Sequence, residues 1–327
     1  MRYGVPYKGS KNGIAEWVYS HLPKRANFYD LFAGGCAITQ IALMRQEYKR
    51  YFCNDIDAGG IKLFLDAIYG KYANEARWIS REDFFKLKDT DPYIKYCWSF
   101  GNNGRDYLYS KEIEPYKRAW HYAIYFNDFA PAEALGIDLK AIEPIKDIQE
   151  RYSVTRRLIQ LDDARNIEVE RQQQLEALNR LQSLQSLQSL QSLQSLQSLQ
   201  SLQSLQSLQS LQSDFADVHI LPDSVIFCDI PYVDTNAYGV RNKNDFDYER
   251  FYAWAESQKE FVFICEYYMP ADRFTCVDYV EKPVMLNSGA SLKATERIFI
   301  PKHQEELYKE WQTTAGGCLF DFAELCG

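Results

Sequence analysis

The residues best suited to chemistry follow a hydrophobic strand, where Val225–Asp229 runs into Ile230, Pro231 and Tyr232. One reaction that such residues could assist is attack by the exocyclic amine of adenine. This amine is a poor nucleophile, because its lone pair is delocalised into the ring. Two hydrogen-bond acceptors aimed at its two N–H groups would localise that pair on nitrogen. The Asp229 carboxylate and the backbone carbonyl of Ile230, held by the rigid Pro231, could provide them. The Tyr232 ring could stack on the base, whereas the alternative interpretation is an ordinary turn at a strand end.

Two earlier strand ends carry residues suited to a nucleoside cofactor. Asp30–Phe32 leads into a turn at Gly34-Gly35, where glycines let a ligand approach the backbone at the carboxyl edge of a parallel sheet. Asp55 follows the next strand, where a carboxylate can accept hydrogen bonds from both hydroxyl groups of a ribose. The alternatives are a purely structural turn and a helix-capping aspartate. Together the two sites favour a nucleoside cofactor, and the absence of a G-x-G-x-x-G pattern disfavours NAD and FAD.

The elements that must position these residues alternate between strands and helices. Helices are predicted at residues 37–48, 58–70 and 248–257. Strands are predicted at residues 27–32, 51–54, 224–229, 261–265, 274–280 and 297–300. Such alternation predicts an α/β fold with a parallel, Rossmann-like sheet and helices on both faces.

A segment of different character interrupts this alternation. Residues 86–180 interleave aromatic and basic side chains, and residues 144–180 are predicted to be helical. Leu181–Ser213 then consists of eleven uninterrupted Leu-Gln-Ser copies. A leucine at every third position drifts by about 60° per copy around a helix, so no fixed apolar seam results. The repeat also has no Lys or Arg, and we interpret it as a spacer that does not itself bind DNA.

Composition limits the class of protein. The chain has 327 residues, is 46% hydrophobic and 25% charged, and lacks both a signal peptide and an apolar run of membrane-spanning length, so we expect a cytoplasmic protein. Its cysteines and histidines show no metal-ligand spacing, and no metal is expected. The net charge of −8 disfavours a protein that coats nucleic acid, but residues 1–50 carry eight basic and three acidic side chains, which allows a basic face.

Four motifs in order give the chain a specific resemblance. They are Tyr7-Lys8-Gly9-Ser10-Lys11, Asp30–Gly35, Asn54-Asp55 and Asp229–Tyr232, followed by Phe263–Tyr267 and Thr295–Phe299. This set resembles the Dam-type family of DNA adenine-N6 methyltransferases. The resemblance implies an S-adenosylmethionine-dependent enzyme with an inserted, mainly helical target-recognition domain. On this basis we divide the chain into cofactor-binding (1–85), target-recognition (86–180), repeat (181–213) and catalytic (214–327) parts.

The resemblance also implies roles for individual residues. Tyr7 and Lys11 would contact the methionine end of the cofactor, and Asp55 its ribose. The amino-acid and adenosine parts would be held by Asp30, Phe32, Gly34 and Gly35, and the adenine by Asp214 and Phe215. Catalysis would rest on Asp229, Ile230, Pro231 and Tyr232. Phosphate contacts would come from Arg105, Lys111, Lys117 and Arg118.

One departure from the family pattern bears on the substrate. The family's D-P-P-Y motif is D-I-P-Y here, and N-I-P-Y is typical of rRNA adenine dimethyltransferases. The second position contributes mainly a backbone carbonyl, so Ile230 can preserve the chemistry, while Asp229 and the long insertion favour DNA. We therefore expect a site-specific, adenine-specific DNA methyltransferase that acts as a monomer on double-stranded DNA, with a restriction nuclease as a possible partner. The alternatives are an RNA adenine-N6 methyltransferase and a catalytically inactive DNA-binding relic.

Overall fold

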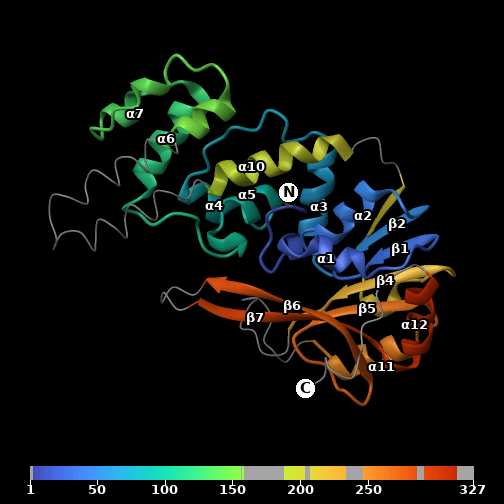
Figure 1. The fold of residues 1–327 in the computed structure, drawn as a ribbon. Coiled ribbons are helices and arrows are strands. Elements are labelled where there is room, and N and C mark those ends of the chain that lie inside the picture. Colours follow the sequence, from blue (N-terminus) through green and yellow to red (C-terminus); the bar gives the residue numbers. More distant parts are fainter. Residues whose placement is uncertain are drawn as a thin grey trace. The chain divides into compact units, whose positions relative to one another are not determined.

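The computed structural model describes residues 3–155, 157, 188–202, 207–232, 246–285 and 291–314. The chain divides into two compact units, one made of Met1–Gly70 with Ser198–Gly327 and the other of Lys71–Gln197 (Figure 1). The first unit therefore combines sequence from both sides of a long insertion.

Within the described residues, the first unit is built on a seven-stranded sheet in the order β3-β2-β1-β4-β5-β7-β6. The strands are β1 (Asn27–Asp30), β2 (Arg50–Asn54), β3 (Leu208–Leu211), β4 (Ser224–Asp229), β5 (Phe261–Glu266), β6 (Phe274–Met285) and β7 (Ser291–Pro301). β1 to β5 run parallel, and β7 is antiparallel to both of its neighbours. The predicted Rossmann-like α/β fold is confirmed, with β6 and β7 longer than predicted.

Helices cover both faces of this sheet. On one face lie α1 (Ala15–Ser20), α2 (Ala37–Arg45), α3 (Gly59–Ile68) and α12 (Glu305–Thr314), and on the other lies α11 (Tyr248–Ser257) (Figure 1). The short 3-10 helices are η1 (Lys11–Gly13), η4 (Leu199–Leu202), η5 (Phe215–Asp217) and η6 (Lys302–Gln304). Because both faces are covered, the central strands are continuous apolar runs, and Val225–Cys228 and Phe261–Cys265 are all buried.

The strand order places three carboxylates at one edge of the sheet. The order reverses between β1 and β4, and open α/β sheets bind ligands in the crevice outside the carboxyl ends of strands at such a point. β1 ends at Asp30 and β4 at Asp229. β7 pairs with β5 through Arg297–Phe299. The part of β7 that ends at Glu296 therefore extends past the carboxyl end of β5 and is paired with β6.

The second unit is mainly helical in its described part. It contains α4 (Arg81–Leu87), α5 (Pro92–Cys97), α6 (Glu114–Phe126), α7 (Ala130–Glu133), most of α10 (Gln188–Ser198) and the 3-10 helices η2 (Phe100–Asn102) and η3 (Lys140–Ile142). Of the helix predicted at 144–180, residues 148–155 are helical, and residues 158–180 lie outside the described residues.

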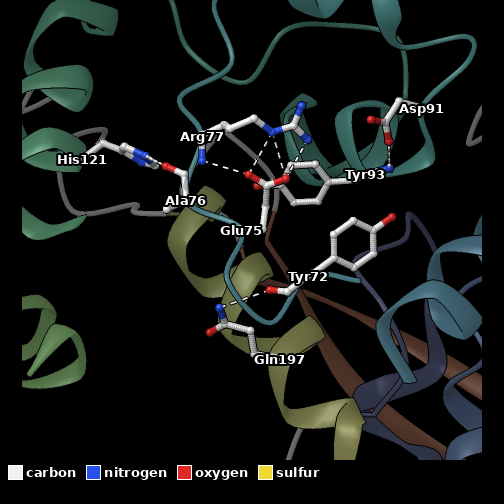
Figure 2. Close-up of polar contacts among 8 residues, drawn as sticks. All are labelled: Tyr72, Glu75, Ala76, Arg77, Asp91, Tyr93, His121 and Gln197. Carbon is white, nitrogen blue, oxygen red and sulfur yellow. Dashed lines mark hydrogen bonds and ion pairs between the residues drawn. The ribbon is translucent and has the colours of Figure 1, made fainter. Parts of the chain in front are cut away.

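Polar contacts tie the start of this second unit to its interior (Figure 2). Arg77 makes a two-pronged ion pair with Glu75, and the buried His121 donates through Nε2 to the carbonyl of Ala76 at 2.7 Å. Gln197 at the end of α10 donates to the carbonyls of Tyr72 and Ala73. Burial lowers the pKa of His121 to about 4, although its hydrogen bond to the Ala76 carbonyl opposes the shift.

The Leu-Gln-Ser repeat is part of the folded structure, which its interpretation as a spacer did not anticipate. Leu193, Leu196, Leu199 and Leu202 are buried. Around an α-helix, three successive leucines of the repeat span an arc of only about 120°, which fits the apolar stripe of a helix. In η4, a leucine at every third position matches the three residues per turn of a 3-10 helix. The last copies form the edge strand β3, which pairs with β2 from Tyr51↔Leu208 to Asn54↔Leu211.

We expect the fold to tolerate removal of one complete Leu-Gln-Ser copy. Every position of α10, η4 and β3 then receives the same residue type, and Leu211 still packs on the core. Deletion of Gln212 alone would instead bring Ser210 to the position of Leu211, because Ser213 is fixed to Asn54 by three hydrogen bonds. Thermal unfolding tests this: the copy deletion should shift Tm by less than about 2 °C and the single deletion by more than about 5 °C. Equal shifts would contradict it.

Candidate active site

Asp229, the last residue of β4, is paired with a buried lysine. Lys11 Nζ lies 2.8 Å from Asp229 Oδ1, and the exposed fractions of the two side chains are 5% and 19%. Lys11 also lies 4.6 Å from the centre of the Tyr232 ring. Burial by itself lowers the pKa of Lys11, but the neighbouring carboxylates of Asp229 and Glu296 outweigh it and raise that pKa above its ordinary value. Lys11 is therefore a cation bound directly to the predicted catalytic carboxylate.

The remainder of the Asp-Ile-Pro-Tyr motif is held by contacts from other elements. Ile230 is buried, and the Pro231 carbonyl accepts a hydrogen bond of 2.9 Å from the Tyr248 hydroxyl of α11. The hydroxyl of Tyr232 donates to Glu296 Oε2, and its ring centre lies 4.4 Å from that of Tyr267. The turn thus has anchors on α11, β7 and the end of β5.

Asp30 is a buried carboxylate with one satisfied oxygen. Its Oδ2 accepts hydrogen bonds from the backbone N–H and the hydroxyl of Thr39 at 3.2 and 2.7 Å. Its Oδ1 is buried and has no hydrogen-bond partner within the described residues. Burial raises the pKa of Asp30 to about 7, and the nearby Asp229 adds to the effect. A buried carboxylate with one open oxygen is suited to a cationic or hydrogen-bond-donating ligand.

The glycine turn after β1 is packed against the chain's own N-terminal segment. A Cβ on Gly35 would lie 2.6 Å from the Cβ of Tyr7 and 2.9 Å from the Val5 carbonyl oxygen. A Cβ on Gly60, in α3, would lie 2.0 Å from the carbonyl oxygen of Gly34. The glycines were predicted to admit a ligand, and the structure provides a second reason for them, since α3 and the N-terminal segment both touch this turn.

Gly60→Ala should therefore destabilise the protein, although alanine is favoured over glycine inside a helix by about 1 kcal/mol. The carbonyl of Gly34 leaves no space for the added methyl group, so we expect the free energy of unfolding to fall by about 2–4 kcal/mol in urea denaturation. Gly13→Ala is a suitable control, because a Cβ there would meet nothing within 4 Å. A gain in stability for Gly60→Ala would refute this packing argument.

Asn54 and Asp55 at the end of β2 bind backbone on both sides. Asp55 accepts the N–H groups of Gly34 and Asp57 at 2.8 and 2.9 Å. Burial raises its pKa to about 6, although these N–H groups oppose the shift. Asn54 is buried and fixes the last repeat residue, Ser213, immediately before Asp214. The motif thus joins the glycine turn to the segment that follows the repeat.

Asp214 and Phe215 adjoin Phe32 beside the end of β1. Arg250 of α11 donates to both carboxylate oxygens of Asp214, at 2.8 and 2.9 Å, and this interaction lowers the pKa of Asp214. The buried Phe215 ring lies 5.6 Å from that of Phe32 and 5.4 Å from that of Phe251. The predicted cofactor residues of β1 and of the post-repeat segment are therefore neighbours.

The four predicted phosphate-binding residues lie in the second unit and differ in exposure. Arg105, Lys111 and Arg118 are exposed, and Arg105 pairs with the adjacent Asp106 at 2.9 Å. Lys117 is buried at 2% exposure, and its ammonium lies 5.8 Å from the centre of the Tyr109 ring. Burial lowers the pKa of Lys117 to about 7. In this conformation three of the four side chains are accessible to a phosphate.

Sequence reasoning missed two groups at the site. Glu296 was part of a quoted motif but received no role, and Arg250 was not singled out. Glu296, on β7, contacts Tyr232 and Lys11, which lie far from it in the sequence. Arg250, on α11, lies 36 positions after Asp214 and binds its carboxylate. The sequence held little signal for Glu296, because β7 also carries Lys293 and Arg297; its burial in the structure marks it, since buried charges are rare unless paired.

Two searches of the described residues concern metals and membranes. They contain no cluster of three or more His, Cys, Asp or Glu side chains arranged to hold a metal ion. None of the helices in these residues combines the length and the apolar character that a membrane span needs.

Comparison with models of protein families gives a match over most of the chain. A family model described as D12 class N6 adenine-specific DNA methyltransferase matches residues 7–269. The span begins at Tyr7 and includes the turn after β1, Asp55, Asp214 and the Asp-Ile-Pro-Tyr motif. None of the curated proteins matches the chain.

Proposed function

The chain belongs to the D12 class N6 adenine-specific DNA methyltransferases, and from this membership we propose that it transfers a methyl group from S-adenosylmethionine to the N6 amine of adenine at a specific sequence in double-stranded DNA. The family match confirms the predicted resemblance to Dam-type adenine methyltransferases. The observation that most directly supports the proposal is the position of Asp229 and Tyr232 beside the end of β1, at the reversal in strand order.

The residues at the end of β1 fit the proposed cofactor. The amino-acid end of S-adenosylmethionine carries an ammonium group, and the open, buried Oδ1 of Asp30 would accept a hydrogen bond from it. Gly34, Gly35 and Tyr7 would adjoin this end, Asp55 would bind the ribose, and Phe32, Asp214 and Phe215 the adenine. When bound, the cofactor supplies an electrophilic sulfonium methyl group.

The chain's own residues would then prepare the target amine. A target adenine rotated out of the duplex would stack on Tyr232 and donate its two N–H groups to Asp229 and to the Ile230 carbonyl. These acceptors keep the lone pair on nitrogen and hold it in place for transfer. The Tyr248 hydroxyl supports the turn by binding the Pro231 carbonyl.

The proposed target-recognition part, residues 86–180, lies within the second unit. Its exposed Arg105, Lys111 and Arg118 would bind phosphates, and Lys117 would join them only if its buried side chain became accessible. The proposed division of the chain remains 1–85, 86–180, 181–213 and 214–327. We further propose that the protein acts as a cytoplasmic monomer, with a restriction nuclease as its partner.

Incubation with methyl-labelled S-adenosylmethionine and DNA lacking adenine methylation tests the proposal. Label should appear in N6-methyladenine of the DNA, and sequencing that detects modified bases should locate it at one short recurring sequence. Label found in RNA alone would support the RNA methyltransferase alternative. Duplex binding without label at any enzyme concentration would support the inactive relic and refute transfer.

A further inference from the structure

Glu296 is a buried carboxylate without an assigned role at the active-site edge. It lies on β7 next to Arg297, which is the first residue of that strand to pair with β5. Its exposed fraction is 1%, and a carboxylate is rarely buried so deeply in a folded protein. An ionised side chain at this depth is costly unless it is paired, so its partners indicate why it is there.

Those partners are the catalytic groups. The Tyr232 hydroxyl donates to Glu296 Oε2, and Lys11 Nζ lies 3.9 Å from the same oxygen. Lys11 Nζ is closer to Asp229, at 2.8 Å. A single buried lysine therefore lies between a partly exposed carboxylate, Asp229, and a buried one, Glu296, nearer to the one that the proposed reaction uses.

The neighbouring residue of β7 supports the same aromatic side chain by another route. Arg297 Nη1 donates to the carbonyl of Tyr267 at 2.7 Å, and the Tyr267 ring lies 4.4 Å from that of Tyr232. Two consecutive residues of one strand thus hold Tyr232, Glu296 through the hydroxyl and Arg297 through Tyr267.

This arrangement has a consequence for substrate entry. The Asp229 carboxylate must accept an N–H of the target amine, yet Lys11 occupies one of its oxygens. If Lys11 left Asp229 without another anion nearby, a buried cation would lose its pair, which is strongly unfavourable. Glu296 is near enough to take it over by a small side-chain movement.

We propose that Glu296 is a positioning residue, which holds the Tyr232 hydroxyl and receives Lys11 when the target amine binds Asp229. The inference rests on the proposed function, because it needs an amine that competes for Asp229. Glu296 lies outside residues 7–269, the span of the family match. It touches neither the base nor the cofactor and acts through Tyr232 and Lys11.

Two conservative substitutions separate its two contacts. Glu296→Gln keeps an acceptor for the Tyr232 hydroxyl but removes the charge that Lys11 needs, and we expect kcat to fall by about 10–100-fold. Tyr232→Phe keeps the stacking ring and removes only the hydroxyl, and we expect a loss of about 3–10-fold. Because the hydroxyl acts through Glu296, the double variant should be less impaired than the product of the single losses.

The readout distinguishes positioning from a structural role. Initial rates with labelled S-adenosylmethionine and unmethylated genomic DNA give kcat, while calorimetry gives the Kd for S-adenosylmethionine, which should change by less than about 2-fold. Glu306→Gln, on the exposed side of α12, should behave like the unchanged protein. If Glu296→Gln unfolds, Tyr232→Phe alone decides, since the hydroxyl contact predicts a loss.

Three results would overturn the inference. They are an unchanged kcat for Glu296→Gln, an unchanged kcat for Tyr232→Phe, and losses that multiply in the double variant. Its failure is separable from failure of the proposed function: absence of label in DNA with the unchanged protein refutes the function, whereas an active protein that tolerates these variants refutes only the role of Glu296.

Discussion

Asp229→Ala is expected to reduce kcat for methyl transfer by about 10³-fold or more, while the Kd for S-adenosylmethionine changes by less than about 3-fold. The carboxylate would accept one of the two N–H groups of the target amine. Among the described residues, Glu296 is the only other acidic side chain within ion-pair distance of Lys11, and thus the only one near enough to replace Asp229. The cofactor residues Asp30 and Asp55 remain in place. Single-turnover rates with labelled cofactor, together with calorimetric binding, check both parts.

The control for this variant addresses Lys11. Removing Asp229 takes away the nearer partner of a buried ammonium, but Glu296 can still pair with it, so Asp229→Ala should lose less unfolding free energy than the roughly 3–5 kcal/mol that a fully unpaired buried charge costs. Replacing Lys11 by Met in the same protein should recover most of that loss, because a buried ion pair exchanged for apolar groups is often neutral. Activity should stay absent. If the stable double variant transferred methyl groups, Asp229 would not be the catalytic acceptor.

Asp30→Asn is expected to weaken S-adenosylmethionine binding by about 10-fold or more and, at pH 8, to stabilise the free protein by about 2–4 kcal/mol. The pKa of Asp30 is raised to about 7, mainly by burial. Between about pH 4 and 7 the folded state therefore holds a proton that the unfolded state has released, and stability falls as pH rises through this window. Asparagine removes this cost but cannot pair with a cation.

Measurements at two pH values separate the effect of charge from that of shape. In urea unfolding, Asp30→Asn and the unchanged protein should be nearly equal in stability at about pH 3, below the pKa of Asp30 in both the folded and the unfolded state, and should differ at pH 8. The exposed Asp272→Asn should show no such change. The Kd of the unchanged protein for S-adenosylmethionine should rise as pH falls below about 7, because protonation neutralises Asp30. Tight binding to Asp30→Asn would show that Asp30 is not a cofactor residue.

Much of the first unit could be predicted because its signals are local. The strand Ser224–Asp229 is an apolar run that ends in a charge, and the helix Tyr248–Ser257 begins after Asp247, whose side chain caps it by accepting the N–H of Arg250. The motifs around Asp30, Asp55 and Asp229 were predicted at strand ends, and each lies at or directly after the end of its strand.

The repeat shows where local signals fail. Identical Leu-Gln-Ser copies form the α-helix α10, the 3-10 helix η4 and the strand β3. One sequence cannot encode three conformations, so the choice comes from the surroundings. In β3 it comes from the open edge of β2 and from Asn54, which binds Ser213.

The sequence by itself determined the chemical types at this site: a carboxylate, a carbonyl and an aromatic ring after β4, and the order of motifs that identifies the family. Only the tertiary structure decided which charges meet. Lys11 precedes Asp229 by more than two hundred residues and Glu296 follows it by more than sixty, yet all three come together because β4 and β7 end or extend at the same edge of the sheet. It also decided that Lys117 is buried while Arg118 is exposed. Spacing along the chain determines a residue's face on its own element, but contacts between distant residues depend on strand order and register.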